Sequence, residues 1–222
     1  LPRGEGNKSL WPFSRGEREI SAEGRMESEK QAIGNMLLNV VAFQIGWFAC
    51  VLGGAWGWPW LGVAVTAAVV TLHLRRAVQP RMEAVLIGLS GLLGFLADSL
   101  LTGLGLLHFP SGQFHSQLAP YWMVAMWMLF ATTLNVSLRS LKPHLELASL
   151  LGMIAGPLAY YGGAKLGGVS FGEPLASLAA VSGVWTLAMP LLLIIAGRWN
   201  GMAETAPTSA GPGMSDKAGK PG

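Results

Sequence analysis

Long apolar stretches separated by short polar connections make up most of this chain. A helix needs about 20 mostly apolar residues to cross the hydrocarbon core of a bilayer. Stretches of about that length occupy residues 34–53, 56–74, 82–102, 119–140, 145–165 and 175–197. The pattern therefore predicts an all-α, polytopic membrane protein with six transmembrane helices.

The polar residues gather at the two ends of the chain. Residues 1–33 are rich in Glu, Lys and Arg, and residues 200–222 in Pro, Gly, Ser and Ala, a composition typical of disorder. We expect a disordered extension over 1–33, a six-helix membrane domain over 34–199, and a disordered cytoplasmic tail over 200–222. Met26, just ahead of the first apolar stretch, leaves open whether residues 1–25 are translated.

The sparse charges predict an orientation. Only 12% of the residues are charged, and 51% are hydrophobic, whereas soluble domains carry about 25% charged residues. Basic residues mark alternate connections: Arg75, Arg76, Arg81, Arg139, Lys142 and Arg198. The opposite connections hold only Lys165, so the positive-inside rule predicts that both termini are cytoplasmic. The net charge of +3 thus reflects topology, and we expect no nucleic-acid partner.

A carboxylate, Asp98, lies within the third apolar stretch. It shares a predicted helix face with small residues, the whole stripe being Ala84, Gly88, Gly91, Phe95, Asp98, Thr102 and Gly105. Helices in lipid pack through such faces, so Asp98 should point into the bundle. Intramembrane ionisable residues are functional candidates. Two structural alternatives stay open, a hydrogen bond to a neighbouring helix and an ion pair with Lys165.

The fifth stretch carries a second small-residue stripe, which includes the GxxxG pattern of Gly152 and Gly156. It predicts close packing against a neighbouring helix. Pro157 follows, and Pro190 lies within the sixth stretch. Each removes a helical hydrogen bond, which frees the carbonyl four residues earlier.

Signatures of known chemistry are weak. The single Cys50 excludes a disulfide within the chain. Residues 168–172 read GVSFG, but the nucleophile-elbow motif requires a strand before its serine and a helix after it. His108, His115 and Glu173 lack the spacing of a metal motif. We therefore expect no metal and no cofactor, and the pattern does not favour an enzyme.

Four stretches together resemble the bacterial inner-membrane family catalogued as domain of unknown function 2878. They are NVVAFQIGWFACVLGG (39–54), GLLGFLADSLLTGLGLLHF (91–109), APYWMVAMWMLFATTLNVSL (119–138) and GMIAGPLAYYGGAKLGG (152–168). The resemblance covers residues 34–197. It implies a small multi-pass protein of the bacterial cytoplasmic membrane without an assigned activity. Gln44, Asp98 and Tyr160 are among the positions that match the family pattern, and the resemblance gives none of them an assigned role.

Two functional hypotheses follow. The first is a protein that binds or transports a lipid or small solute through a polar pocket around Asp98, with candidate residues Asp98, Gln44, Asn39, Asn135, Lys165 and Tyr160. The second is a structural or partner subunit that anchors a membrane-associated, lipid-modifying enzyme. A pocket from Asp98 to Gln44 would favour the first hypothesis, and a solid interior the second.

Overall fold

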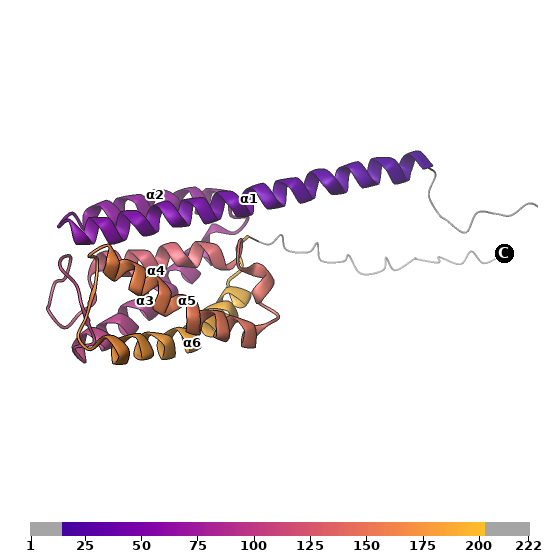
Figure 1. Ribbon diagram of the computed structural model, residues 1–222. Coiled ribbons are helices and arrows are strands. Elements are labelled where there is room, and N and C mark those ends of the chain that lie inside the picture. The colour runs from indigo at the N-terminus through magenta and orange to yellow at the C-terminus, as the bar shows by residue number, and fades with distance from the viewer. Residues whose placement is uncertain (1–14, 203–222) are drawn as a thin grey trace, which may run out of the picture.

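The computed structural model describes residues 15–202, and within them the fold is all-α, as predicted (Figure 1). The helices are α1 (Arg15–Ala55), α2 (Trp60–Arg76), α3 (Pro80–Gly103), α4 (Tyr121–Leu134), α5 (Leu145–Lys165) and α6 (Pro174–Arg198), with a 3₁₀ turn η1 (Arg139–Leu141). Two short strands, β1 (Leu107–His108) and β2 (Ser170–Phe171), pair antiparallel and join the α3–α4 and α5–α6 connections.

Four helical segments in the described part are long and apolar enough to cross a membrane: Glu29–Ala55 of α1, together with α3, α5 and α6. The helices α2 and α4 are shorter, with 17 and 14 residues. At 1.5 Å per residue, α4 is about 21 Å long. The predicted fourth span, 119–140, is therefore too long, because the helix ends at Leu134 and Asn135 turns inward to a buried carboxylate described below.

The first helix is longer than predicted. Residues 15–33, expected to be disordered, form the first turns of α1, which extends beyond the other helices in Figure 1. Adding turns to an existing helix avoids the costly nucleation step, and the Glu, Lys, Arg, Ala and Gln of this segment are good helix formers. The expected disorder of residues 1–14 and of the tail from 203 onward lies outside the described residues.

The central helix of the bundle is α4, none of whose residues is exposed. It packs against α1, α2, α3 and α6, while α5 packs mainly against α6. The GxxxG pattern on α5 makes the predicted close contact. A Cβ at Gly156 would lie 2.4 Å from the ring of Trp185, and one at Gly152 would lie 2.3 Å from the carbonyl oxygen of the same residue. Only glycine allows α6 to approach so closely.

The helix α5 continues through Pro157, and α6 compensates for the lost hydrogen bond. The proline leaves the carbonyl of Met153 without its helical donor. Ser182 of α6 donates its hydroxyl to that oxygen at 2.8 Å. The freed carbonyl thus forms part of the α5–α6 interface.

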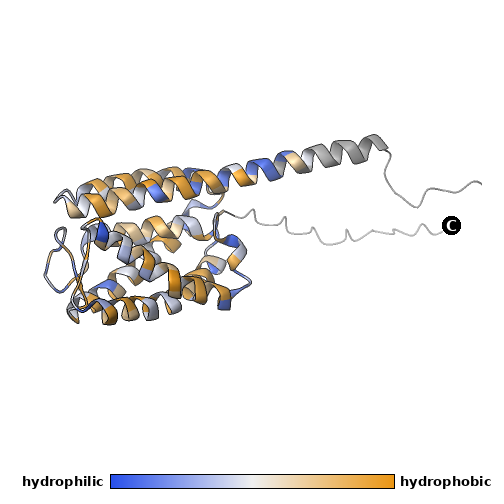
Figure 2. Ribbon diagram, viewed as in Figure 1, coloured by the Kyte–Doolittle hydropathy of each residue, from blue (hydrophilic) through white to orange (hydrophobic). Residues whose placement is uncertain are grey.

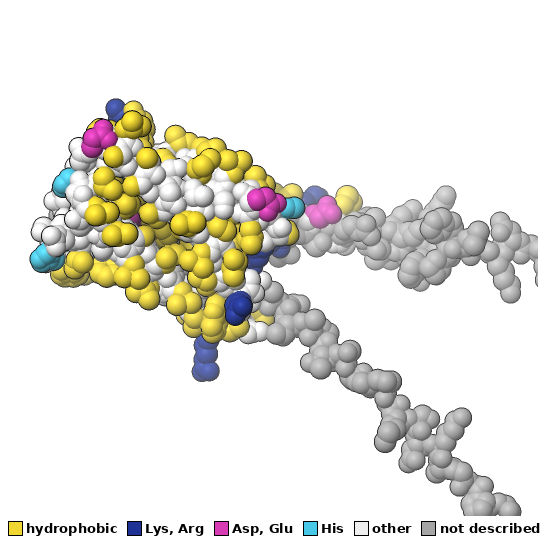
Figure 3. All heavy atoms as spheres, turned by 90° about the horizontal axis from the view of Figure 1, so that it is seen from below, with side chains coloured by type: hydrophobic (Ala, Val, Ile, Leu, Met, Phe, Trp, Pro, Cys, Tyr) yellow, Lys and Arg dark blue, Asp and Glu magenta, His cyan; other side chains and the backbone are white. Residues whose placement is uncertain are grey.

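Apolar side chains cover the outside of the bundle. Figure 2 shows hydrophobic residues along all the helices, and Figure 3 shows them across the middle of one face, with most charged residues toward the two ends. Large apolar side chains such as Leu96, Leu100, Leu158 and Leu187 are each more than half exposed. So many exposed apolar residues are atypical of a soluble protein and fit a lipid surrounding.

The buried face of α3 is only partly the predicted one. Gly91, Asp98 and Thr102 are buried, but Ala84 and Gly88 are exposed. At that end of the helix Glu83 and Leu86 are buried instead. The predicted stripe is therefore not the buried face near the start of α3, where the side of the helix that carries Glu83 faces inward.

Candidate functional site: an apolar cavity and two buried acids

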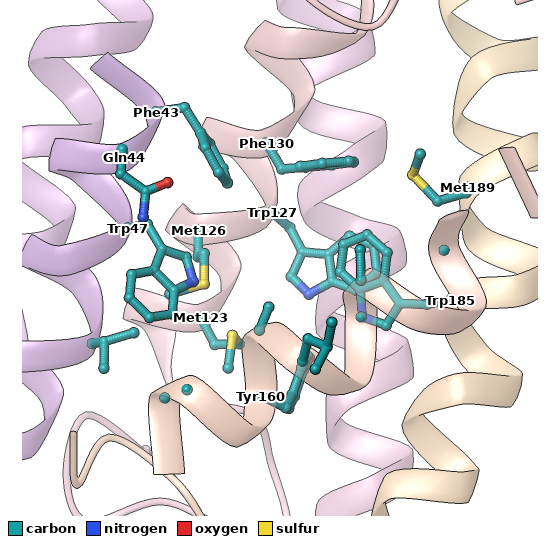
Figure 4. Close-up of a pocket in the computed structure, with 18 of the residues that line it drawn as sticks. Phe43, Gln44, Trp47, Met123, Met126, Trp127, Phe130, Tyr160, Trp185 and Met189 are labelled. Atoms are coloured by element: carbon teal, nitrogen blue, oxygen red, sulfur yellow. The ribbon is translucent and has the colours of Figure 1, made fainter. Parts of the chain in front are cut away.

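A cavity of about 590 Å³ lies between α1, α4, α5 and α6 (Figure 4). Its large wall residues are aromatic residues and methionines, among them Phe43, Met126, Trp127, Phe130 and Trp185, and most of the others are Gly, Ala, Val or Leu. Neither a Lys, an Arg, a His nor a carboxylate lines it. Small-molecule sites typically have volumes of about 300–1,000 Å³, so this cavity has the size of a ligand site and an almost wholly apolar surface.

The small residues of α5 leave this space open. The face of α5 that lines the cavity includes Ala155, Ala159, Gly162 and Gly163, and a Cβ at Gly162 would meet only the ring of Trp47, at 3.7 Å. Ala155, Leu158 and Ala159 line the cavity and are also exposed at the bundle surface. The cavity therefore opens sideways along α5, where a bilayer would surround the bundle.

Behind one wall of the cavity lies Asp98, which is fully buried. Its Oδ2 accepts a hydrogen bond from Nε1 of Trp127 on α4, at 2.8 Å, and its Oδ1 accepts one from the hydroxyl of Tyr160 on α5. Asp98 thus links three helices. Asp98 does not line the cavity, but both of its donors do.

Glycine makes room for this arrangement. A Cβ at Gly94, one turn before Asp98 on α3, would lie 2.0 Å from the ring of Trp127. Trp127 also stacks on Trp185 of α6, with the ring centroids 4.6 Å apart and the planes 16° from parallel. Trp185 Nε1 is buried without a hydrogen-bond partner among the described residues.

Two of the six predicted pocket residues, Gln44 and Tyr160, line the cavity. A third, Asp98, lies behind its wall and is bonded to Tyr160. Asn39 instead donates to the carbonyl of Thr132 at 3.1 Å, and Asn135 binds another carboxylate.

Lys165 is exposed, with its Nζ 5.2 Å from the ring centre of Tyr161. Asp98 and Lys165 do not form an ion pair; Glu83 instead lies within ion-pair distance of His73.

The second buried carboxylate, Glu83, lies near the start of α3 and is also fully buried. Its Oε2 lies 2.8 Å from Nε2 of His73 on α2. Its Oε1 accepts from the side-chain amide of Asn135 and from the backbone N–H of Gly201, the latter at 3.0 Å. Glu83 therefore joins α2, the end of α4 and the segment after α6.

Lys142, after η1, completes this cluster. Its Nζ donates to the side-chain oxygen of Asn135 and to the carbonyl of Ala196, the latter at 3.3 Å. Desolvation lowers the pKa of Lys142 from its ordinary value, and the nearby negative charge of Glu83 partly offsets this effect. The cluster holds four helix ends together at the end of the bundle that carries most of the basic residues.

The sequence analysis missed this cluster. Neither Glu83 nor His73 was among the predicted site residues. The sequence did hold a signal for this contact. His73 lies in the last turn of α2 and Glu83 in the first turn of α3, and only three residues connect the two helices, so the two side chains are close together. Trp127 and Trp185 were missed for another reason, since no local pattern shows that two indoles on different helices will stack.

The residues considered for a metal site do not converge. His108 lies in β1, while Glu173 caps α6 and accepts hydrogen bonds from the backbone N–H groups of Leu175 and Ala176. In the part of the chain that the structure describes, no three or more His, Cys, Asp or Glu residues are grouped so as to hold a metal ion.

A bundle with an apolar exterior, several helices long enough to cross a bilayer and buried acids is the architecture of an α-helical membrane protein. Residues 36–191 match the family described as protein of unknown function DUF2878, and the chain belongs to this family. No curated protein and no solved structure matches the chain.

Proposed function

We propose that this protein is a multi-pass protein of the bacterial cytoplasmic membrane that binds a lipid chain, or another long apolar molecule, in the cavity between α1, α4, α5 and α6. The observation that carries the proposal is an apolar cavity of about 590 Å³ that opens at the lipid-facing surface along α5. Inside a bilayer, acyl chains are the molecules most able to fill such a space.

The proposed topology is six crossings with both termini in the cytoplasm. It is supported by the placement of Arg75, Arg76, Arg81, Arg139 and Arg198 at or near helix ends. In Figure 1 the two ends of the described chain also lie toward the same end of the bundle. The short helix α4 is shielded from lipid by its neighbours, so in this topology its length need not match the hydrocarbon core.

The cavity favours binding over ion transport. An ion pathway requires charged or strongly polar groups along its wall, whereas this wall offers only the Gln44 amide, the Tyr160 hydroxyl and indole N–H groups. The alternative role, a subunit that anchors a lipid-modifying enzyme, stays a prediction.

Filling the cavity tests the proposal. Ala159→Phe adds a ring to the α5 wall at the cavity opening, and Gly183→Leu is the control, because a Cβ at Gly183 of α6 meets no atom within 4 Å and Gly183 does not line the cavity. Lipid retained by the detergent-purified proteins is extracted and quantified by mass spectrometry. We expect Ala159→Phe to lose the retained lipid while Gly183→Leu keeps it. Equal retention in all three proteins would refute cavity binding.

A further inference from the structure

We infer that the cavity selects a ligand that carries an uncharged carbonyl group, a ketone or a neutral ester, on a long apolar chain. The carbonyl oxygen accepts hydrogen bonds from Gln44 and Trp47 on the α1 wall of the cavity. This inference rests on the proposed function and adds the chemical class of the ligand.

Gln44 and Trp47 are polar wall residues that the protein itself leaves free. Both line the cavity, and neither side chain forms a hydrogen bond within residues 15–202. Among those residues the one buried side-chain nitrogen or oxygen without a partner belongs to Trp185. The Trp47 nitrogen, which has no partner either, is therefore accessible, and the Gln44 side chain belongs to an exposed residue.

The other polar groups of the wall are already used or out of reach. Trp127 and Tyr160 both donate to the carboxylate of Asp98. The nitrogen of Trp185 is buried. A ligand in the cavity therefore meets free hydrogen-bonding groups on α1, and not on the wall that covers Asp98.

The two free side chains can bind one atom together. Gln44 and Trp47 are three residues apart on α1, so they are neighbours on one side of the helix. Figure 4 shows the Gln44 amide and the Trp47 ring next to each other on the α1 side of the cavity. The edge of the Trp47 ring faces α5, where a Cβ at Gly162 would lie 3.7 Å from it.

Their depth limits the kind of ligand. At 1.5 Å per residue, Gln44 and Trp47 lie about 16 Å and 12 Å from the end of α1 at Ala55. In the proposed topology both depths fall within the hydrocarbon core, which is about 30 Å thick. Charged lipid headgroups stay in the polar interface, so a ligand that brings an oxygen to this depth has no charged group beside that oxygen.

A carbonyl group matches these two residues. Its oxygen has two lone pairs and can accept from the Trp47 N–H and from the Gln44 amide at once. A pure hydrocarbon leaves both donors unpaired in an apolar medium, which is costly. An anionic or cationic group finds no counter-charge, because no Lys, Arg, His or carboxylate lines the cavity.

The test compares four probes of equal carbon number. They are octadecan-2-one, methyl heptadecanoate, octadecane and octadecanoate, and each competes with an alkyl diazirine probe for photocrosslinking to the detergent-purified full-length protein. We expect the ketone, the ester or both to compete about tenfold better than octadecane and octadecanoate, in line with one or two buried hydrogen bonds. The better of the two carbonyl probes distinguishes a ketone ligand from an ester.

Two variants with matched controls locate the preference. Gln44→Met removes the amide and keeps the chain length, and Trp47→Phe removes the N–H and keeps a ring. The controls are Gln31→Met and Trp60→Phe, because both residues are exposed and neither lines the cavity. Gln44→Met and Trp47→Phe should each lose most of the carbonyl preference while octadecane competes as before, and the controls should keep the preference.

The failures of the two proposals are distinguishable. Equal competition by octadecane and the carbonyl probes, all of it abolished by Ala159→Phe, would leave cavity binding intact and overturn the carbonyl preference. A preference that survives both Gln44→Met and Trp47→Phe would overturn it as well, and so would strongest competition by octadecanoate. Competition by no probe, or crosslinking that Ala159→Phe does not reduce, would overturn both proposals.

Discussion

The two fully buried carboxylates of this bundle are held in different ways. Glu83 lies at the basic end beside His73 and Lys142, and takes hydrogen bonds from a side-chain amide and from the backbone of Gly201. Asp98 lies deeper along the same helix and is held by two neutral donors, with no cation in contact. The first arrangement fastens helix ends together, whereas the second positions groups on a cavity wall.

The comparison assigns different roles to the two buried carboxylates. A buried acid that several helix ends share as a hydrogen-bond partner is typical of a structural role. The two donors of Asp98, Trp127 and Tyr160, in contrast also form part of the cavity wall. Substitutions at Glu83 should therefore act mainly on folding, and substitutions at Asp98 also on the shape of the cavity and on the lipid that it retains.

The largest expected effect is that of Glu83→Ala. Removing this carboxylate leaves His73 and the Gly201 N–H without their partner, and breaking a buried pair typically costs about 3–5 kcal/mol. Unfolding in detergent, followed by circular dichroism, measures the loss. Glu146→Ala is the matched control, because Glu146 lies in the first turn of α5 but is exposed. A similar loss in the two variants would contradict a special role for Glu83.

Gly94→Ala should have the next largest effect. The added methyl group would overlap the ring of Trp127, which must then move away from Asp98. Overpacking of this kind typically costs about 1–3 kcal/mol. Gly88→Ala on the same helix meets no atom within 4 Å and should leave stability almost unchanged. Stability measurements on both variants check the prediction, and tolerance of Gly94→Ala would show that the Trp127–Asp98 contact is not tight.

Asp98→Asn should destabilise less than Glu83→Gln. The amide retains one acceptor and turns a donor toward either Trp127 or Tyr160, an expected loss of about 1–2 kcal/mol. The new amide of Glu83→Gln faces more hydrogen-bond donors than the amide of Asp98→Asn, and the substitution removes the negative charge beside His73. For Asp98→Asn, both membrane yield and the lipid retained by the purified protein are measured. Near-normal yield with reduced lipid retention fits our account, whereas lost yield with unchanged retention per molecule would make Asp98 a structural residue only.

The smallest expected effect is a pH dependence at Lys142. Its pKa is lower in the folded protein than its ordinary value of 10.5, so between the two values the unfolded chain binds more protons. The free energy of unfolding should therefore rise with pH across that window. Lys142→Met should remove this rise, which is seen by comparing both proteins in detergent at neutral pH and at increasing alkaline pH. Parallel pH profiles would contradict the prediction.

Much of the fold could be predicted from the sequence, because apolar length and small-residue spacing are local properties. The GxxxG face of α5 and the inward direction of Asp98 are both present in the structure. The end of α4 could not be predicted, because Asn135 turns toward Glu83, 52 residues earlier in the chain.

The candidate site was predicted less well than the fold. Polarity selected Asn39, Asn135 and Lys165, but each of these side chains has a partner elsewhere. The cavity exists because small side chains on α5 leave space beside large rings on α1, α4 and α6. Such a space depends on how the helices pack in three dimensions, and no run of residues reveals it.

The central claim is that an apolar chain occupies the cavity between α1 and α5. Photocrosslinking in native membranes tests it most directly, with a long-chain alkyl probe that carries a diazirine, followed by peptide mapping. We predict crosslinks concentrated on cavity residues such as Phe43, Met126 and Trp185 and reduced by Ala159→Phe. Crosslinks confined to lipid-facing residues such as Leu92, Leu96 and Leu100 of α3, and unchanged in that variant, would contradict the account.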